Sequence, residues 1–433
     1  MFNLDIEYLA DDQAIWQEIV SQTLGNITPL MLDLWDVVRT IYLSDVRQKR
    51  LTEWTRHMEM KFQVRQPDVW RTEKVSDALR SVVSFAMRDS CDLSFVGRKA
   101  EPILATGAFP FNAVSAVCLF SDGLDSLSGL IASIEQHKSG NFVAVSGITQ
   151  KQVHGRIKKL HKQLEVFFGD RVKSQTIPLY RDGRAKFEGV EEDSQRSRSF
   201  LYLALGAIIA KLYGIDQVET YENGIEMFSF PLKPCPEDLL RQSRAMHPIL
   251  LYRMSELISV LFEEPFRFIA PYAFRTKAEM LGFVKPEHKH LVELTQSCMN
   301  SRTGQSCGHC EGCVLRRLSL QYATFDSCED SYKYDFCSGA DPDSKKKDVA
   351  YALECGVYRL KKCYGTENPF AELMRISGLE HSVRGELLTA TAAVTQTDKS
   401  LVQLNILRLY EQFIREWEGI RPQIEFLATR NNL

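Results

Sequence analysis

Apolar and polar positions along the middle of the chain form a repeating order of short apolar runs and longer amphipathic segments. Short runs rich in β-branched residues predict strands, and segments with apolar positions three and four apart predict helices. Strands that alternate with helices predict an α/β fold, a parallel sheet with helices on both faces. The predicted strands are 113–120, Phe142–Ile148, Val172–Leu179, Val218–Tyr221 and Phe266–Pro271, and the predicted helices are a segment from Leu127 to Ile134, Gln152–Phe168, Arg198–Leu212 and Leu239–Phe262.

The two ends of the chain follow other patterns. Residues 1–110 mix strands and helices without regular alternation, which indicates an N-terminal α+β domain. Its predicted strands are Phe2–Tyr8 and Met58–Val64, and its predicted helices are Pro29–Tyr42 and Thr72–Met87. Residues 321–433 are mainly helical, so we expect three parts, 1–110, 111–320 and 321–433. The last predicted helix turns one apolar face to a core, with Leu404, Leu407, Tyr410, Ile414 and Trp417.

A polar loop separates the first strand of the middle region from its helix, Ser121-Asp122-Gly123-Leu124-Asp125-Ser126. Such a loop lies at the carboxyl end of a parallel strand, where ligands bind, and its N–H groups lie at the positive end of a helix. We therefore expect a bound oxyanion, phosphate above all. The sequence has no G-x-x-x-x-G-K-[ST] and no G-x-G-x-x-G motif, so the loop predicts a compact pyrophosphate site backed by Asp125. An ordinary polar turn is the alternative.

Three further polar segments lie at predicted strand ends or helix starts. Arg196 precedes the helix at 198–212, Glu222-Asn223-Gly224 follows the strand at 218–221, and Lys277 opens the helix after the last strand. Because ligand sites of doubly wound sheets gather at these edges, we expect the segments near the loop. Capping and turn formation alone are the alternative.

Four cysteines gather in a short segment, at Cys298, Cys307, Cys310 and Cys313. Their spacing predicts a tetrahedral Zn²⁺ site, with turns permitted by Gly304, Gly308 and Gly312. An iron–sulfur cluster also takes four thiolates and stays the alternative. A closed Cys₄ site is structural, so we expect this zinc loop, 298–313, to hold neighbouring groups over the nucleotide pocket.

Composition narrows the classes of function. With 53 Lys and Arg against 56 Asp and Glu, the net charge is -3, which makes direct nucleic-acid binding and membrane-surface binding unexpected. A basic cluster at Arg47, Lys49, Arg50, Arg56 and Arg65 predicts a solvated surface, with a partner or nucleic-acid face as the alternative. The absence of a long apolar run and of a secretory leader predicts no membrane and a cytoplasmic location, where cysteines are thiols or metal ligands.

The loop and the cysteines together carry a resemblance to a known family. Ser121 to Ser126 resembles the S-G-G-x-D-S signature of the PP-loop ATP pyrophosphatases, with Asp122 in place of glycine. An Asp there must face away from pyrophosphate or hold Mg²⁺. The element Ser-Cys…Cys-Gly-x-Cys-x-x-Cys-x-x-Arg at 297–316 is similar to that of the QueC-like 7-cyano-7-deazaguanine synthases. The resemblance covers residues 110 to 320 and implies a PP-loop fold with structural Zn²⁺, ATP and Mg²⁺.

The resemblance implies an ATP-dependent carbon–nitrogen ligase. 7-Carboxy-7-deazaguanine is activated as an adenylate, pyrophosphate leaves, and an amine then forms an amide. Catalytic roles fall to Asp125, Ser126, Lys277 and Arg196. The implied nucleotide cradle comprises Ser121, Asp122, Gly123, Leu124, Asp125 and Ser126, with Asn223 and Gly224 beside it. We expect Asp125 and Ser126 to lie on an exposed loop.

The added regions on both sides make the chain similar to the enlarged QueC-like proteins of bacterial anti-phage operons, which join a deazaguanine to a protein amine. That resemblance favours a protein N-terminal amine as the acceptor, on a protein encoded nearby. Ammonia, leading to the nitrile product, is one alternative. A degenerate nucleotide-binding interaction subunit is the other. We further expect the N-terminal region to be dispensable for adenylate formation but required for transfer to the acceptor.

Overall fold

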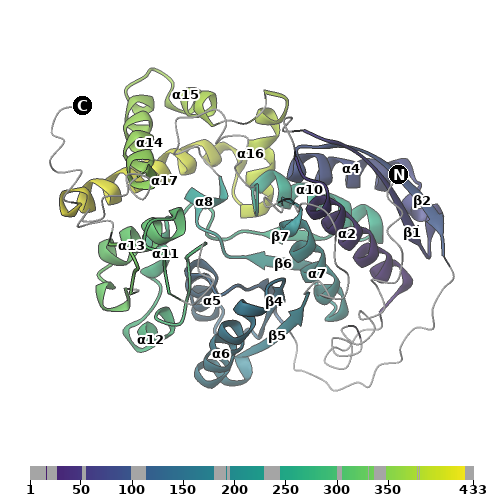
Figure 1. Ribbon diagram of the computed structural model, residues 1–433, viewed down its shortest axis with the longest axis horizontal. Coiled ribbons are helices and arrows are strands. Elements are labelled where there is room, and N and C mark those ends of the chain that lie inside the picture. Colours follow the sequence, from purple (N-terminus) through teal and green to yellow (C-terminus); the bar gives the residue numbers. More distant parts are fainter. Residues whose placement is uncertain are drawn as a thin grey trace.

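Five parallel strands form the central sheet, in the order β5-β4-β3-β6-β7 (Figure 1). They are β3 (Ala116–Leu119), β4 (Phe142–Ile148), β5 (Val172–Pro178), β6 (Gln217–Thr220) and β7 (Arg267–Ile269). The chain builds outward from β3 through β4 to β5 and then crosses back, so that β6 pairs with the other side of β3. The strand order therefore reverses between β3 and β6, where sheets of this kind bind ligands. The predicted parallel α/β sheet is confirmed.

The structure is a computed structural model, and it describes Trp16 and residues 27–50, 55–98, 114–179, 192, 196–228, 244–299, 305–329, 331–335, 348–377, 379 and 381–424. The predicted strand Phe2–Tyr8 lies outside the described residues. Across the described ranges, no helix combines the length and the apolar character needed to cross a membrane.

Helices cover both faces of the sheet because successive strand residues point to opposite sides. Ala116 and Cys118 of β3 belong to the core beneath α5 and α6, whereas Val117 belongs to the core beneath α7 and α10. The helices of this region are α5 (Leu124–Gln136), α6 (Lys151–Phe168), α7 (Arg198–Leu212), α8 (Gly224–Met227), α10 (Pro248–Phe262), α11 (Lys277–Leu281), α12 (Lys289–Val292) and α13 (Glu311–Tyr322). Short 3-10 helices occur at Gly169–Arg171, Pro286–His288 and Asp326–Cys328, and a further one follows the last helix at Arg421–Gln423.

One predicted helix start is wrong. Within the segment predicted as Leu239–Phe262, α10 begins at Pro248, and the residues up to 243 lie outside the described part of the chain. Met246 has a left-handed φ of 55°, which a continuing helix excludes, and the His247 side chain accepts a hydrogen bond from the N–H of Ile249. Proline is favoured at the first helical position because its missing N–H is not needed there.

The N-terminal region is an α+β unit that packs on the main sheet's helices. It comprises α2 (Pro29–Arg47), β1 (His57–Val64), α3 (Pro67–Trp70), α4 (Glu73–Met87) and β2 (Ser90–Gly97). β1 and β2 form a parallel two-stranded sheet, and β2 was not predicted. α2 packs against α7 and α4 packs against α10, so the region shares one hydrophobic core with the central sheet. The predicted domain boundaries stay predictions.

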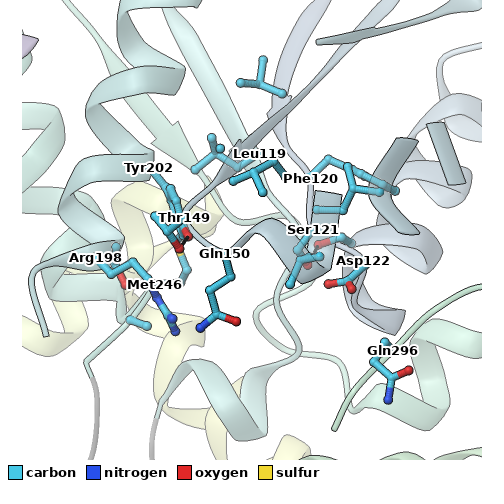
Figure 2. A pocket seen from close by; sticks show the side chains of 18 of the residues that line it. Leu119, Phe120, Ser121, Asp122, Thr149, Gln150, Arg198, Tyr202, Met246 and Gln296 are labelled. Atoms are coloured by element: carbon cyan, nitrogen blue, oxygen red, sulfur yellow. Dashed lines mark hydrogen bonds between the residues drawn. The ribbon is translucent and has the colours of Figure 1, made fainter. Parts of the chain in front are cut away.

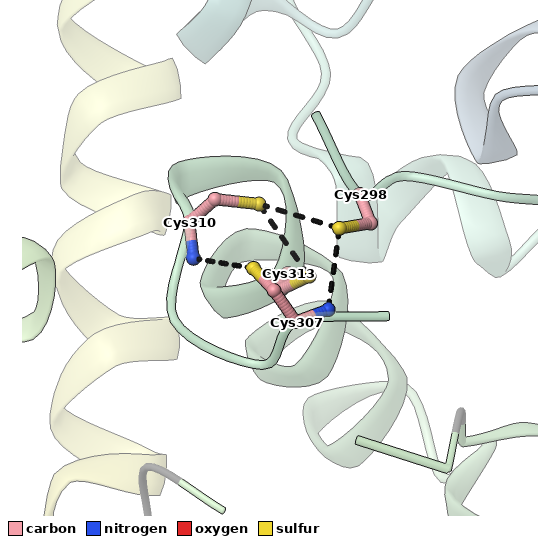
Figure 3. Close-up of side chains that lie close together, drawn as sticks. All are labelled: Cys298, Cys307, Cys310 and Cys313. Carbon is pink, nitrogen blue, oxygen red and sulfur yellow. Dashed lines mark hydrogen bonds between the residues drawn. The ribbon is translucent and has the colours of Figure 1, made fainter. Parts of the chain in front are cut away.

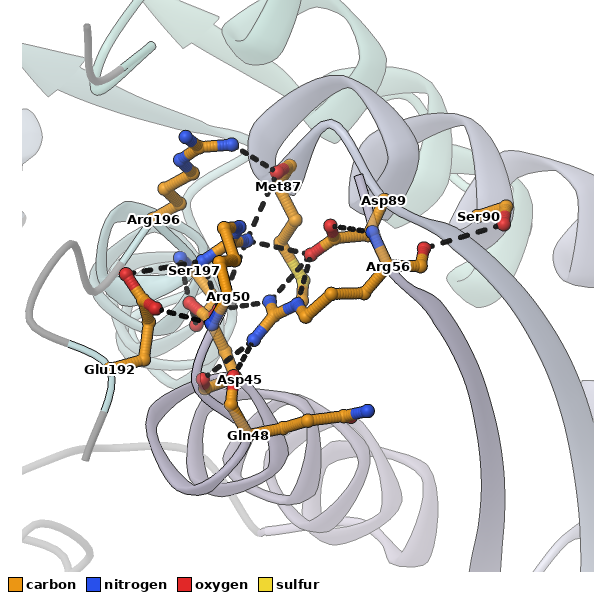
Figure 4. A network of polar contacts seen from close by, with 10 residues as sticks. All are labelled: Asp45, Gln48, Arg50, Arg56, Met87, Asp89, Ser90, Glu192, Arg196 and Ser197. Atoms are coloured by element: carbon orange, nitrogen blue, oxygen red, sulfur yellow. Dashed lines mark hydrogen bonds and ion pairs between the residues drawn. The ribbon is translucent and has the colours of Figure 1, made fainter. Parts of the chain in front are cut away.

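Two residues of the basic cluster predicted as a solvated surface, Arg50 and Arg56, are buried, and the side chain of Arg65 is only 5% exposed, so the prediction is wrong for these three. The Nη2 atoms of Arg50 and Arg56 lie 2.7 and 2.5 Å from Oδ2 of Asp89 (Figure 4). Arg56 Nη2 also lies 2.6 Å from Oδ1 of Asp45. Buried charges are stable only when they are paired, and Asp89 comes from a segment more than 30 residues away, which local spacing does not reveal.

The same network fixes the start of α7. The second carboxylate oxygen of Asp45 accepts hydrogen bonds from the N–H of Ser197, at 2.9 Å, and from its hydroxyl, at 2.8 Å (Figure 4). Asp45 thus binds a backbone N–H immediately before a helix whose own side chains provide no cap. A side chain of the N-terminal region therefore positions a helix of the central sheet.

Four helices complete the C-terminal region: α14 (Asp348–Tyr364), α15 (Pro369–Ile376), α16 (His381–Thr395) and α17 (Lys399–Ile420). α17 crosses the upper part of the view in Figure 1 and packs against α13, α14, α16 and α8. The prediction of a mainly helical region is confirmed, but the predicted buried face is partly wrong. Leu404 is 63% exposed, because the buried face is centred on Leu409 and Phe413.

Candidate functional site

The polar loop after β3 lies at the predicted edge of the sheet and runs directly into α5. The hydroxyls of Ser121 and Ser126 are 2.9 Å apart, and the N–H of Gly123 donates to Ser121 Oγ at 3.1 Å. Asp125 and Ser126 belong to the first turn of α5 and are 6% and 7% exposed. The prediction of an exposed loop is wrong for these two side chains, because the helix begins earlier than its apolar positions suggested.

Asp125 lies where three segments of the chain meet. Asn223 Nδ2 donates to Asp125 Oδ2 at 2.7 Å, and Lys277 Nζ donates to the same oxygen at 2.9 Å. Asn223 follows β6 and caps α8, while Lys277 is the first residue of α11, whose cap Thr276 forms a capping box with Glu279. The structure thus brings together three residues predicted for the site from strand ends alone.

Two further acids complete this cluster. Glu222 and Glu226 lie with Asp125 so that one carboxylate oxygen of each is within 4.8 Å of the others. Lys277 Nζ is 2.9 Å from Glu226 Oε2. Burial raises the pKa of Asp125 to about 6 against the opposing charge of Lys277, and burial with the charges of Asp125 and Glu226 raises the pKa of Glu222 to about 8. One lysine does not balance three carboxylates.

The donor set of this cluster fits Mg²⁺. Mg²⁺ takes oxygen ligands and is usually held by one or two carboxylates together with substrate phosphates. Asp125, Glu222 and Glu226 supply such oxygens beside the polar loop Ser121–Ser126, and a divalent cation would offset their mutual repulsion. Of the three, Asp125 and Glu222 lie in segments predicted for the site, whereas Glu226 was not predicted.

Asp122, the residue that departs from the family signature, is paired with Arg156 of α6. Its Oδ2 accepts from Arg156 Nε at 3.0 Å and lies 2.9 Å from Arg156 Nη2. Burial raises the pKa of Asp122 while Arg156 opposes that effect. The negative charge of Asp122 is therefore compensated by Arg156, while its predicted orientation relative to pyrophosphate stays a prediction.

A cavity of about 390 Å³ opens beside the loop, with Ser121 and Asp122 at one end and Arg198, Tyr202 and Met246 at the other (Figure 2). Its apolar wall is formed by Phe120, Val145, Ile148, Val153, Ile157 and Leu205. A smaller cavity of about 190 Å³ lies over the loop and is lined by the acidic cluster and Lys277. The larger cavity thus has an apolar wall and ends at the loop Ser121–Ser126, called the phosphate-type loop below because its sequence predicts a phosphate site. Such a cavity suits a planar heterocycle linked to phosphates.

Arg196 lies away from these cavities and lines neither of them. Its Nη1 donates to the carbonyl of Met87 at 3.0 Å, in the buried network between the N-terminal region and α7 (Figure 4). Arg198, two residues later, lines the larger cavity instead. The sequence predicted a basic residue of the site at this helix start. Whether Arg196 or Arg198 faces the cavity depends on the orientation of α7 about its axis, which the sequence does not reveal.

The four predicted cysteines converge (Figure 3). Cys310 Sγ lies 3.5 Å from Cys313 Sγ and 4.0 Å from Cys298 Sγ, and Cys307 Sγ lies 3.9 Å from Cys313 Sγ. Zn–S bonds of about 2.3 Å in a tetrahedron place the sulfurs about 3.8 Å apart, so the spacing fits one Zn²⁺ ion.

The backbone around the cysteines also suits a metal loop. The N–H groups of Cys307 and Cys310 point to Sγ of Cys298 and Cys307, at 3.3 and 3.4 Å, and such contacts stabilise thiolates. Gly308 has φ 83°, and a Cβ there would lie 1.9 Å from the carbonyl oxygen of Tyr334. The glycine predicted for this turn is therefore required, while Gly304 lies outside the described residues.

The cysteine loop is tied directly to the phosphate-type loop. The N–H of Gln296 donates to the carbonyl of Asp122 at 2.7 Å, and its side chain donates to Ser306 Oγ at 2.8 Å. Cys298 lines the larger cavity as well as belonging to the cysteine cluster. This arrangement fits the predicted role of the loop, which is to hold groups over the nucleotide pocket.

The middle of the chain is similar to known proteins. Residues 115–324 match the family model described as "Queuosine biosynthesis protein QueC". The chain is 22% identical over 218 residues to a 7-cyano-7-deazaguanine synthase of Leptospira interrogans, covering 48% of this chain and 86% of that protein. It is 26% identical over 225 residues to a 7-cyano-7-deazaguanine synthase of Anaeromyxobacter, covering 48% of this chain and 92% of that protein. The matched segment contains both the phosphate-type loop and the cysteine cluster.

Proposed function

We propose that this chain, whose residues 115–324 form a QueC-like domain, activates the carboxylate of a 7-deazaguanine with ATP and joins it to an amine. The observation that carries the proposal is the meeting of Asp125, Asn223 and Lys277 at the start of α5, beside a cavity with an apolar slot. The proposed substrate is 7-carboxy-7-deazaguanine, and the proposed setting is the cytoplasm.

In the first step, a carboxylate oxygen of the base attacks the α-phosphorus of ATP. The bond from this phosphorus to the bridging oxygen breaks, and pyrophosphate leaves with the electron pair. The N–H groups at the start of α5 and the hydroxyls of Ser121 and Ser126 bind its developing charge. Mg²⁺ held by Asp125, Glu222 and Glu226 would supply further charge neutralisation. Lys277 fixes Asp125 and Glu226 in place.

In the second step, an amine nitrogen attacks the acyl carbon. AMP leaves with the electron pair of the carbon–oxygen bond, the nitrogen loses a proton, and an amide results. We assign the amine to the N-terminus of a protein acceptor in an anti-phage system. The support is that about half of this chain aligns with 86% and 92% of the two synthases, so the remaining regions are additions suited to a large acceptor.

The test is ATP–pyrophosphate exchange with 7-carboxy-7-deazaguanine, using 7-deazaguanine without the carboxylate as the control. We expect exchange that depends on the carboxylate and on Mg²⁺. Mass spectrometry of products then compares ammonium with candidate protein acceptors. Efficient nitrile formation from ammonium would identify an ordinary 7-cyano-7-deazaguanine synthase. No exchange with any acidic deazaguanine would identify a nucleotide-binding subunit without ligase activity.

A further inference from the structure

The helix α17 lies across the two segments that hold the partners of Asp125. One segment, Ala273 to Glu279, carries Lys277, and the other, α8 with its cap Asn223, packs against α17 directly. α17 begins at Lys399, beyond the part of the chain that matches the QueC family model. The site's inner residues therefore rest on an element that the matched domain lacks.

The first contact is made by a buried carboxylate. Glu416 is 1% exposed, and its Oε1 accepts from the hydroxyl of Thr276 at 2.5 Å and from Gln412 Nε2 at 3.1 Å. Thr276 caps α11 and immediately precedes Lys277, and its hydroxyl accepts in turn from the N–H of Glu279 at 3.1 Å. Glu416 thus fixes the cap from which Lys277 projects.

The second contact is made by Arg408, one side of which is open to solvent. Its Nη1 donates to the carbonyl of Phe274 at 3.0 Å, and its Nη2 pairs with Glu279. Glu279 is the other member of the capping box around Thr276. Arg408 therefore contacts this short segment near both of its ends, and Glu416, two turns later on α17, contacts Thr276 in its middle.

The third contact leaves no room for movement between the two segments. A Cβ added to Gly224 would lie 2.1 Å from the carbonyl oxygen of Ala273 and 2.4 Å from Leu409 Cδ2. The N–H of Gly224 donates to the carbonyl of Arg275 at 2.8 Å. Leu409 of α17 thereby closes the junction at which Asn223 and Lys277 approach Asp125.

We propose that α17 is a positioning element of the active site, with Glu416 and Arg408 as positioning residues that hold Lys277 against Asp125. Burying a carboxylate costs free energy unless its partners offset the loss of hydration, and an apolar side chain fills such a position at lower cost. The Glu416 carboxylate is hydrogen-bonded to Thr276, the residue before Lys277, and we infer that its role is to position that lysine. The expected effect on catalysis rests on the proposed function, whereas the effect on the position of Lys277 rests on the contacts alone.

The test uses variants that separate placement from folding. Glu416→Leu removes the hydrogen-bond acceptor for Thr276 but fills the buried position with an apolar side chain of similar size. Arg408→Met removes the charge but keeps an unbranched side chain. Glu416→Gln keeps an acceptor oxygen and serves as the conservative rescue. The matched control is Glu411→Ala with Arg415→Ala, an exposed ion pair on the same helix, with the two side chains 52% and 62% exposed.

Two readouts distinguish the inference from the proposed function. The first is kcat and KM for ATP in pyrophosphate exchange, where we expect kcat to fall about tenfold or more in Glu416→Leu and Arg408→Met with little change in KM. The second is labelling of Lys277 by acetic anhydride, followed by peptide mass spectrometry, where we expect about tenfold faster labelling in the same variants. Glu416→Gln and the control pair should match the unmodified protein in both.

The outcomes decide the two proposals separately. Unchanged labelling and unchanged kcat in folded Glu416→Leu and Arg408→Met would overturn the positioning role. Faster labelling in a protein that shows no exchange even without substitutions would support the positioning role and overturn the proposed function. If Glu416→Leu fails to fold, Arg408→Met decides the matter, because the partly exposed arginine is removed without opening the core.

Discussion

The guanidinium of Arg156 lies 2.9 Å from the carboxylate of Asp122, beside the phosphate-type loop. We expect Arg156→Ala to raise KM for ATP about tenfold, because an unpaired carboxylate repels the phosphates. Replacing both residues, with Asp122→Gly, should restore most of the affinity. Steady-state exchange kinetics measure the effect, and Lys158→Ala, an exposed basic residue on the same helix, is the control. An unchanged KM in Arg156→Ala would show that the pair does not influence the nucleotide.

Asp125 and Lys277 should act as one unit in catalysis. We expect Asp125→Asn and Lys277→Met each to lower kcat for exchange by about 100-fold or more, because each disturbs the charges that meet the departing pyrophosphate. Since residues that act together are not additive, the double variant should be little worse than either single one. Circular dichroism and thermal unfolding check the fold. Additive losses in the double variant would contradict a shared role.

The cysteine cluster should hold one Zn²⁺ per chain. Elemental analysis of purified protein measures zinc and iron together. We expect Cys310→Ser to lose the metal and to lower the yield of folded protein, because the binding energy of a structural metal is folding energy. Cys355→Ser, which replaces an exposed thiol outside the cluster, is the control. Iron in stoichiometric amount would favour the iron–sulfur alternative.

Asp45 should stabilise the joint between the N-terminal region and α7. Asp45→Asn leaves Arg50 and Arg56 with less compensating charge in a buried site, so we expect the free energy of unfolding to fall by about 3 kcal/mol. Denaturant unfolding measures it, with Asp92→Asn as an exposed control in the same region.

These contacts, and the shared core, argue against the expectation that residues 1–110 are dispensable for adenylate formation. A loss no larger than in the control would revive that expectation.

Glu416 should make stability depend on pH. Burial raises its pKa to about 7 against the hydrogen bonds from Thr276 and Gln412, with Glu279 adding to the rise and Arg408 opposing it. The folded protein therefore holds this proton more tightly than the unfolded chain, so the contribution is full below about pH 4.5 and is lost as the pH rises through 7. We expect the unmodified protein to lose stability relative to Glu416→Gln between pH 5 and pH 8, by about 3 kcal/mol. Denaturant unfolding of both proteins across this pH range measures the difference. The same pH dependence of the free energy of unfolding in both would contradict titration of Glu416.

Local pattern sufficed for the strands of the sheet and for the cysteine cluster. Phe142–Ile148 and Arg198–Leu212 have the predicted bounds, because a buried parallel strand and an apolar helix leave clear runs in the sequence. Asn223 and Lys277 were placed near Asp125 by topology alone, since parallel strands end at one edge. β2 escaped prediction although Cys91 and Phe95 alternate with exposed neighbours.

The residues that prediction missed depend on tertiary contacts. Arg156 lies on a helix beside Lys158 and Lys159, and nothing in its local sequence distinguishes it from these exposed neighbours. Arg50 and Arg56 have the spacing of a solvated basic run, but their partners Asp45 and Asp89 come from separate helices and turns. Glu416 has the composition of a helix surface and is buried only because Thr276 meets it from another segment, 140 residues away.

α17, the brace that holds the segments carrying Asn223 and Lys277, is synthesised after the segments that it contacts. A chain leaving the ribosome presents Asp125 first, and Lys277 follows 152 residues later. Glu416 emerges another 140 residues after Thr276, so the whole QueC-like domain is outside the tunnel before its brace exists. Nascent or prematurely terminated chains therefore lack the contact of Glu416 with Thr276, which forms only once α17 has been made.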